Sequence, residues 1–234
     1  MAGSRAETAR HAAEAIAAVL RRPARCKLVL STGETMVGIY RELVRLHREG
    51  RAPLSRAETF NVDELRVRAH DPRSFRVFME RHLFRRVALP TERIHFLDGD
   101  AQNAEIECRR YEHDLARAGG ADLVLLGIGA NGHIAYLEPG PSLPPLTTLV
   151  RLSASTRQRL AASGVRPVPR QALTMGLETI LSAGQILLVA TGASKARIVA
   201  RALSGRITPQ CPASYLSIHP KLTVILDPAA ASRL

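Results

Sequence analysis

The segment Gly127–Glu138, with the sequence GIGANGHIAYLE, carries the residues best suited to acid–base chemistry. Its single histidine, His133, titrates near neutral pH, as a group that gives and takes protons must. Glu138 follows five residues later, and if the chain turns back it can reach the far imidazole nitrogen and set the tautomer. Three glycines allow the backbone to approach a ligand closely. We therefore expect a functional histidine here, although most lone histidines are structural.

Two other kinds of site fit this segment poorly. GIGANG matches the letters of the GxGxxG dinucleotide-binding turn, but an opening helix and a ribose-binding acid downstream are not convincingly present. His133 has no histidine two or four residues further on, so it lacks the usual spacing of metal ligands. We therefore expect no metal site here.

A second acid–base candidate is Asp63, which follows the expected strand segment 59–62 and has Glu64 beside it. A carboxylate at the end of a strand inside a crevice can act as a general base. Taken alone, such a residue is more often a loop acid or a helix cap. Its significance therefore depends on what lies near it in space.

Two strand–helix junctions have the composition of an anion site. The first joins Thr32, Gly33, Glu34 and Thr35 after Ser31, and the second runs from residue 191 to Lys195. Hydroxyls and backbone N–H groups at a helix N-terminus can hold a phosphate, although the GxxxxGK[ST] pattern of a P-loop is missing. A capped turn and a surface lysine are the plain alternatives. The carboxylate of Glu34 would repel a phosphate unless it points away.

The elements that must position these residues alternate along the chain. Short apolar strands are expected at Lys27–Ser31, Glu58–Val62, Arg93–Leu97, Asp122–Gly127, Thr147–Leu152, Gln185–Ala190 and Leu222–Asp227. Helices are expected near the N-terminus and at Thr35–Arg48, Pro72–Arg86, Ala101–Arg117, Arg170–Leu181 and Lys195–Leu203. This order predicts an α/β fold with a doubly wound, mostly parallel sheet of about seven strands and helices on both faces. We expect one domain spanning residues 1–234.

Five of these strands end in polar or glycine-rich clusters. They are residues 31–35, 61–64, 98–100, 127–133 and 191–195. In an open α/β sheet the ligand lies outside the carboxyl ends of the strands. Five clusters on one rim predict a single site and favour an enzyme over a structural protein.

The net charge of +12 suggests nucleic acid as a partner, but the distribution of charge argues against it. Only three of the 33 basic residues are lysines, acidic residues interrupt the arginines, tryptophan is absent and aromatic residues make up 4%. Stacking platforms for single strands are therefore not evident. We expect no nucleic-acid partner and keep nucleic-acid binding as a minor alternative.

The longest apolar runs are far too short to span a membrane, so no membrane association is expected. Cys26, Cys108 and Cys211 are too few and too separated for a disulfide framework, which indicates a reducing compartment. Glu7 and Glu14 argue against a transit peptide and favour an amphipathic first helix. We expect a cytoplasmic protein.

Several ordered motifs resemble the glucosamine-6-phosphate deaminases, which share their fold with the 6-phosphogluconolactonases. They include STGETMVGIYREL, TFNVDEL, SFRVFMERHLF, GGADLVLLGIGANGHIAYLEPG, ALTMGLETIL, LLVATGASKA and PASYLSIHPKLTVILD. The resemblance runs from about Lys27 to Ser232. Glu138-Pro139-Gly140 favours the deaminase branch, because lactonases typically read DGHTASLFPG at this point.

The resemblance implies conversion of glucosamine 6-phosphate and water to fructose 6-phosphate and ammonia, without metal or organic cofactor. His133 would protonate the ring oxygen, with Asn131 and Glu138 positioning it. Asp63 would then move a proton between C2 and C1. Substrate and phosphate would be bound by Thr32, Gly33, Glu34, Thr35, Gly129 and Lys195.

The sequence departs from the family pattern at several positions. The family motif TRxANxR reads here as residues 156–162, and Ala162 stands where a phosphate-binding arginine is expected. Losing one charge-assisted contact costs about 1.5–3 kcal/mol. Arg159, Arg166 and Arg170 are the candidates to replace it, and a related sugar phosphate is an alternative substrate. Asn131 stands where some members carry Asp, Leu137 replaces an Asn, and Glu34 replaces a Ser.

Thr148 and Val150 occupy the positions where allosteric oligomers carry an arginine and a lysine, and the chain ends soon after the last expected strand. We therefore expect no activation by N-acetylglucosamine 6-phosphate and a monomer or small homo-oligomer. Two other functions remain open, namely a 6-phosphogluconolactonase acting through His133 and a non-catalytic sugar-phosphate sensor. The proline-rich loop after Glu138 and the segment 153–170 are candidate lids.

Overall fold

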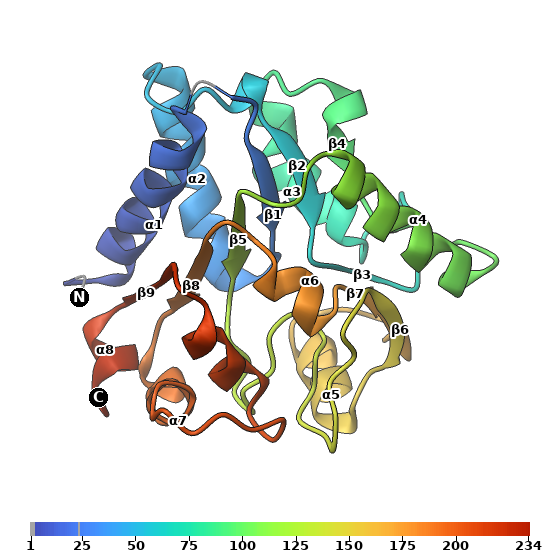
Figure 1. Cartoon of the computed structure of the whole chain (residues 1–234), viewed down its shortest axis with the longest axis vertical. Coiled ribbons are helices and arrows are strands. Elements are labelled where there is room, and N and C mark those ends of the chain that lie inside the picture. Colours follow the sequence, from blue (N-terminus) through green and yellow to red (C-terminus); the bar gives the residue numbers. More distant parts are fainter. Residues whose placement is uncertain (1–2, 23) are drawn as a thin grey trace.

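The computed structural model describes residues 3–22 and 24–234, and a six-stranded parallel sheet runs through its centre (Figure 1). The strand order is β4 (Ile94–His95), β2 (Glu58–Asn61), β1 (Lys27–Leu30), β5 (Leu123–Leu126), β8 (Ile186–Ala190) and β9 (Leu222–Leu226). Every residue of β5 and β8 is buried, because helices cover both faces and leave no side for polar residues. The predicted fold class is confirmed, with six parallel strands instead of seven.

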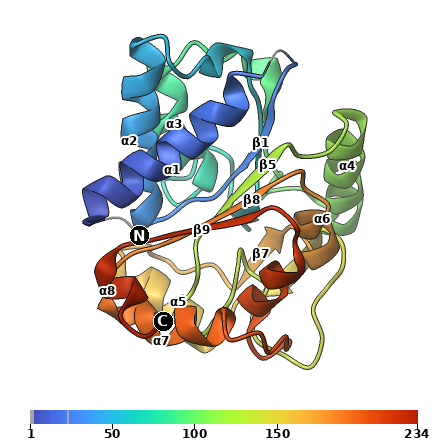
Figure 2. The ribbon, with the colours of Figure 1, turned by 60° about the vertical axis from the view of Figure 1, so that its left-hand side comes forward.

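Successive strand residues point to opposite faces and divide the core in two. One core packs Leu28 and Leu30 against α1 (Arg5–Leu20), α2 (Glu34–Arg48) and α3 (Phe75–His82). The other packs Val29 against α4 (Ala104–Arg117), α6 (Leu177–Leu181), α7 (Ala196–Ala202) and α8 (Pro228–Ala231). Figures 1 and 2 show the α1–α2 pair and α4 on opposite sides of the sheet. Short 3-10 turns occur at Leu54–Arg56, Phe84–Arg86, Thr91–Arg93, Ala193–Lys195 and Pro212–Ile218.

A second, antiparallel sheet has the order β3 (Asp63–Leu65), β7 (Gln171–Thr174) and β6 (Thr148–Arg151). The strand predicted at 147–152 therefore exists but does not belong to the parallel sheet. Its residues alternate between half-buried and exposed, as in an antiparallel strand with one face open to solvent. The structure thus corrects the sheet to which this strand was assigned.

The helix predicted over 170–181 is wrong in its first half. Residues 171–174 form β7, and only α6 is helical. Pairing with both β3 and β6 overrides the helix-forming residues Gln171 to Leu173, since tertiary contacts outweigh local propensity. The break falls at Gly176, where a Cβ would lie 2.2 Å from the carbonyl oxygen of Pro145.

Two segments link the sheets and the site. β2 ends at Asn61, the chain passes through Val62, and Asp63 opens β3, so Asp63 sits in a strand and not in a loop. A helix that the sequence did not predict, α5 (Ala154–Ala162), follows β6, with Ser153 accepting a hydrogen bond from the N–H of Thr156. Among the described residues, no helix combines the length and apolar character needed to cross a membrane.

Tyr111 of α4 fixes the end of β2. Its hydroxyl accepts a hydrogen bond from the N–H of Asn61 and donates one to the carbonyl of the same residue, both at 2.7 Å. Tyr111 is fully buried, so these backbone groups have no access to water in its place. The contact therefore holds the strand that leads into Asp63.

Replacing Tyr111 by Phe leaves the two buried backbone groups of Asn61 unpaired. We expect the free energy of unfolding to fall by about 1–3 kcal/mol, measured by urea denaturation. Tyr215→Phe is the control, since this half-buried hydroxyl makes no hydrogen bond to the described residues; its change should stay within about 0.5 kcal/mol. Equal losses in the two variants would contradict the role given to Tyr111.

Candidate active site

A pocket of about 630 Å³ lies at the carboxyl ends of β1, β5 and β8. The residues around it include Ser31–Thr35, Asp63, Gly127–Gly129, His133, Thr156, Arg159, Thr191 and Lys195. Strand order changes direction between β1 and β5, which is the switch point where ligands bind in open α/β sheets. Four of the five clusters predicted to share one rim contribute to this pocket.

The fifth cluster, residues 98–100, does not line the pocket. It follows β4 at the outer edge of the sheet, far along the strand order from the switch point. The N–H of Asp98 donates to Glu107 at 2.7 Å, and Asp100 pairs with Arg68 at 3.8 Å. These acids therefore hold a turn and do not form part of the site.

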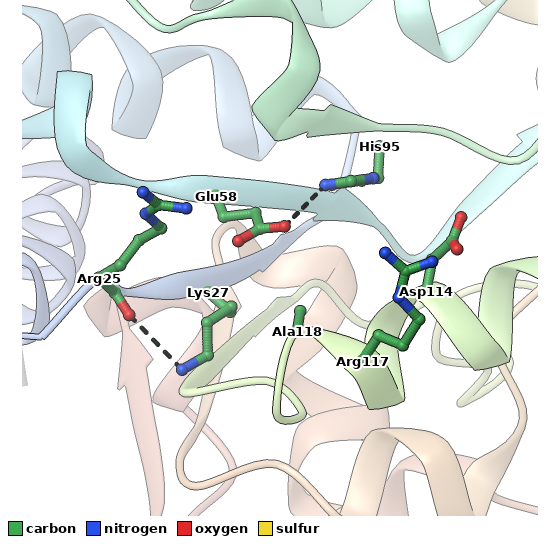
Figure 3. Close-up of a pocket in the computed structure, with 7 residues that line it drawn as sticks. All are labelled: Arg25, Lys27, Glu58, His95, Asp114, Arg117 and Ala118. Atoms are coloured by element: carbon green, nitrogen blue, oxygen red, sulfur yellow. Dashed lines mark hydrogen bonds and ion pairs between the residues drawn. The ribbon is translucent and has the colours of Figure 1, made fainter.

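A second hollow, of about 560 Å³, lies at the amino ends of β1 and β2 beside the end of α4 (Figure 3). Most of its charged side chains are paired. Glu58 and His95 point toward each other at 2.9 Å, and the ammonium of Lys27 lies 3.0 Å from Asp122. Arg25 and Arg117 pair with no carboxylate among the described residues, but neither Asp63 nor His133 lines this hollow, so it lacks the acid–base residues expected from the sequence.

His133 and Glu138 meet because the chain turns back between them. Ala135 adopts a positive φ of 48°, and Ile134 and Leu137 pair across the turn. The carboxylate oxygen Oε2 of Glu138 then lies 3.7 Å from Nδ1 of His133 and accepts a 2.7 Å hydrogen bond from Nδ2 of Asn131. The predicted grouping of a histidine, its carboxylate and Asn131 is present in the structure.

Glu138 is held in its ionised form. Burial opposes ionisation, but the adjacent imidazole of His133 and hydrogen bonds from Thr156 and Asn131 lower the pKa of Glu138 to about 2. Its other oxygen, Oε1, accepts from the hydroxyls of Ser153 and Thr156 at the start of α5. The carboxylate therefore joins the histidine loop to α5.

The surroundings of His133 favour its uncharged form. Burial is the largest cause that lowers its pKa, and the charges of Arg159 and Lys195 add to it against the opposing charge of Glu138. The ring rests on the backbone of Gly129, where a Cβ would lie 2.2 Å from the imidazole Cε1. Gly129 lines the pocket as predicted, and it also makes room for the histidine.

Asp63 lines the pocket from the first position of β3 and is only 7% exposed. Burial, and then the negative charge of Glu64, raise the pKa of Asp63 well above its usual range. Its Oδ1 accepts no hydrogen bond from the described residues. A buried, unpaired carboxyl group with raised proton affinity has the properties of a general base.

Glu64 points the other way and is hydrogen-bonded at the start of α3. It accepts from the hydroxyl of Ser74 and from the backbone N–H groups of Phe75 and Arg76. Phe75 lines the pocket and stacks with Tyr136, another lining residue that the sequence did not single out. Glu64 therefore fixes one wall of the pocket while its charge acts on Asp63.

The junction at residues 32–35 leads into α2, and all four residues line the pocket. Gly33 precedes the helix with a φ of 122°, which favours glycine. The side chain of Glu34 is 96% exposed and 4.0 Å from Arg5. Its carboxylate faces solvent, so the repulsion expected for a phosphate is avoided and the backbone N–H groups remain available.

Two cations face the pocket without a carboxylate partner among the described residues. The ammonium of Lys195 donates to the carbonyl of Ile128 at 2.7 Å, and Nη2 of Arg159 donates to the hydroxyl of Thr156 at 2.9 Å. Burial and then the charge of Arg159 lower the pKa of Lys195. Two neighbouring positive charges that lack a counterion favour a bound dianion.

The structure selects Arg159 among the three arginines considered for the missing phosphate contact. Arg166 and Arg170 do not line the pocket, whereas Arg159 does. Arg159 precedes Ala162 by three residues on α5, so both lie on the same helix face. Helical spacing would have identified Arg159 if α5 had been predicted.

No group of three histidine, cysteine, aspartate or glutamate side chains in the part of the chain that the structure describes is arranged to hold a metal ion. The pocket is lined instead by the carboxyl group of Asp63, whose pKa is raised, by the imidazole of His133 and by the two cations without a carboxylate partner, together with the ion-paired side chains of Arg5, Glu34 and Arg73. Such a set can move protons on a substrate that carries its own negative charge.

Comparison with known proteins places this arrangement in a family. The model of the family described as glucosamine-6-phosphate isomerases/6-phosphogluconolactonase matches residues 3–225. Glucosamine-6-phosphate deaminase 1 of Giardia intestinalis is 43% identical over 220 residues, covering 92% of this chain and 82% of that protein. The glucosamine-6-phosphate deaminase of Geobacillus sp. (strain WCH70) is 41% identical over 97% of this chain and 91% of its own length. The solved structure of a monomeric glucosamine-6-phosphate deaminase superposes with a TM-score of 0.95 at 38% identity, covering 99% of this chain and 98% of the other.

The cation pair predicts that the protein binds a simple dianion. At about ten times its dissociation constant, sulfate should stabilise the fold by about 1.4 kcal/mol and raise Tm by about 3–5 °C over chloride at equal ionic strength. Lys195→Met and Arg159→Met should each reduce this increase. Arg157→Met, an exposed arginine on the same helix outside the pocket, should not. An increase that survives both pocket substitutions would place the sulfate elsewhere.

Proposed function

The chain belongs to the family of glucosamine-6-phosphate isomerases and 6-phosphogluconolactonases, and we propose that it is an enzyme converting glucosamine 6-phosphate and water to fructose 6-phosphate and ammonia. The observation that carries the proposal is the content of one pocket. A buried carboxyl group (Asp63), an imidazole (His133) and two cations without counterions all line it. An aldose–ketose isomerisation needs the first two, and a sugar phosphate needs the cations.

The first step opens the sugar ring. The ring oxygen takes a proton as its bond to C1 breaks, and the C1 hydroxyl loses its proton to water and becomes a carbonyl. His133 supplies the proton to the ring oxygen, because an imidazole can carry and release a proton and this one lines the pocket. The carboxylate of Glu138 lies beside the imidazole and accepts a hydrogen bond from Asn131, so these two residues keep the imidazole ring of His133 in place.

The second step moves a proton from C2 to C1. Asp63 takes the C2 proton and returns it to C1, while the carbonyl oxygen on C1 gains a proton and the C2 amine loses one, so C1 becomes a hydroxymethyl carbon and the C2 amine becomes an imine. Water then adds to C2, and the carbon–nitrogen bond breaks as ammonia leaves. Burial suits Asp63 to this transfer, because a carboxyl group with raised proton affinity is a stronger base and is shielded from bulk water.

The phosphate of the substrate lies against Arg159 and Lys195, with Thr32, Gly33 and Thr35 at the start of α2 completing the site. Arg159 provides the bidentate contact expected one turn further on, at Ala162. Glu34 contributes its backbone only, since its side chain faces solvent. The substitution at Ala162 is thus compensated within the same helix.

The direct test is to measure ammonia and fructose 6-phosphate formed from glucosamine 6-phosphate, with hydrolysis of 6-phosphogluconolactone followed in parallel. Equal amounts of ammonia and ketose support the proposal. Hydrolysis of the lactone without ammonia would assign the chain to the other activity of the family. Failure with both substrates would refute the proposed reaction.

Replacing Asp63 by Asn or His133 by Gln removes the proposed base or acid. We expect kcat to fall by about 10²–10⁴-fold in each variant, which the ammonia assay measures. Tm should stay within about 3 °C of the parent, because Asp63→Asn removes a repulsive pair and His133→Gln leaves the glycine-lined space filled. Near-normal turnover in either variant, with the fold intact, would refute the assigned role.

Glu64→Gln should move the acidic limb of the pH profile of kcat/KM to lower pH. Asp63 acts as a base only when ionised, and the negative charge of Glu64 raises its pKa. Removing that charge lowers the pKa, so the active form persists to more acidic conditions. Glu42→Gln, two turns further along α2 than the pocket residue Thr35, outside the pocket and paired with Arg45, is a charge-matched control that should leave the limb in place. A limb that stays fixed in Glu64→Gln would show that Asp63 does not set it.

We also propose that residues 1–234 act as one domain, as a monomer or small homo-oligomer in the cytoplasm. A monomeric relative with a TM-score of 0.95 and three buried free cysteines support this proposal. Exposed arginines such as Arg45 and Arg109 pair with carboxylates on their own helices, which favours a sugar phosphate over nucleic acid as partner.

Light scattering should therefore give a mass of one or a few chains, and the rate should depend hyperbolically on substrate concentration. N-acetylglucosamine 6-phosphate should not activate the enzyme, because Thr148 and Val150 provide no cations for it. A sigmoidal curve that this compound makes hyperbolic would overturn the proposal.

A further inference from the structure

Arg159 lies beside Nε2 of His133, the ring nitrogen that must carry a proton if the imidazole is to act as an acid. Its Nη2 lies 3.5 Å from Nε2 of His133, while Nδ1 of the same ring faces Glu138 at 3.7 Å. A guanidinium has only donors, so Nε2 facing it is an acceptor without a proton. These contacts fit a neutral imidazole with its proton on Nδ1, which lies beside Glu138 but makes no hydrogen bond to the described residues.

This tautomer cannot protonate a sugar ring through Nε2. Adding a second proton would place an imidazolium next to the guanidinium of Arg159 and near the ammonium of Lys195. Like charges at such distances disfavour the charged form. The acid therefore needs something to draw the guanidinium away or to offset its charge.

Given the proposed function, we propose that Arg159 is a positioning residue that links phosphate binding to protonation of His133. Its guanidinium turns from Nε2 to the phosphate when substrate binds, and Nε2 then takes a proton from water. That proton is the one His133 later gives to the ring oxygen. The substrate thus prepares the acid that acts on it.

The contacts around Arg159 allow this movement. Its side chain is exposed at the mouth of the pocket, and among the described residues it is held by the 2.9 Å hydrogen bond to Thr156 and the contact with His133. A dianion also offsets the charge of Lys195, and bidentate contact with phosphate satisfies a guanidinium better than one hydroxyl does. Both positive charges facing His133 are therefore neutralised in one event.

The carboxylate of Glu138, on the other side of His133, is held by several hydrogen bonds that do not involve Arg159. Glu138 is fixed by Asn131, Ser153 and Thr156, so its negative charge stays beside Nδ1 and supports the imidazolium once it forms. Linkage requires the converse as well, so protonation of His133 must strengthen anion binding by the same factor. An amino sugar without phosphate is then expected to lose kcat as well as affinity.

The test is a pH titration of His133 by NMR, with its signals assigned from His133→Gln. Sulfate is the probe, because it stays a dianion over the range where imidazole titrates, and chloride at equal ionic strength is the reference. In the parent protein sulfate should raise the pKa of His133. In Arg159→Met the pKa should already be higher in chloride, and sulfate should raise it less. Arg157→Met should behave as the parent.

Two results would overturn the inference. One is an unchanged pKa of His133 when the amide signals of Gly33 and Thr35 show that sulfate is bound to saturation. The other is an Arg159→Met variant whose pKa values match the parent in both salts. Ammonia release from glucosamine 6-phosphate is measured on the same proteins. Turnover without the sulfate-linked change refutes the inference and leaves the function standing, whereas the change without turnover supports the link and refutes the function.

Discussion

The carboxylate of Glu138 is the contact on which the geometry of the site depends. One oxygen accepts a hydrogen bond from Asn131 and lies beside His133. The other accepts hydrogen bonds from the two hydroxyl groups at the start of α5. α5 is not part of either sheet, and the side chains at its start bind this one carboxylate. The helix in turn places Arg159 at the pocket. Protonation of Glu138 would remove the negative charge beside His133 and weaken its hydrogen bonds with Asn131 and the start of α5, and its low pKa keeps it ionised near neutral pH.

The parallel sheet could be predicted because the composition of its strands indicates that they are buried. Residues 123–126 are apolar throughout, as a strand covered on both faces must be, and the polar clusters after β1, β5 and β8 mark the edge where ligands bind. The antiparallel sheet could not be predicted in the same way. Gln171–Thr174 has a helix-forming composition and becomes a strand only through pairing with β3 and β6.

The candidate site was predictable in kind but not in every member. Asp63, His133 and Lys195 follow strands, so the fold brings them together once the strand order is known. Arg159 lies on a helix that sequence periodicity did not reveal, because α5 buries only Thr156 and has no apolar stripe. Residues 98–100 have a composition suited to a site, but they follow β4, which lies at the edge of the sheet and not beside the pocket.

Asp63 and Glu64 are consecutive residues of one strand, and they face opposite ways, one into the pocket and the other into the start of α3. Which of the two carboxylates faces the pocket therefore depends on the number of residues that link Asn61 to Asp63, and not on the chemistry of that link. Adding or removing a single residue at Val62 would exchange the two carboxylates between pocket and helix. Insertions and deletions at this link would therefore do more damage to the site than conservative apolar substitutions of Val62, which is buried in the core.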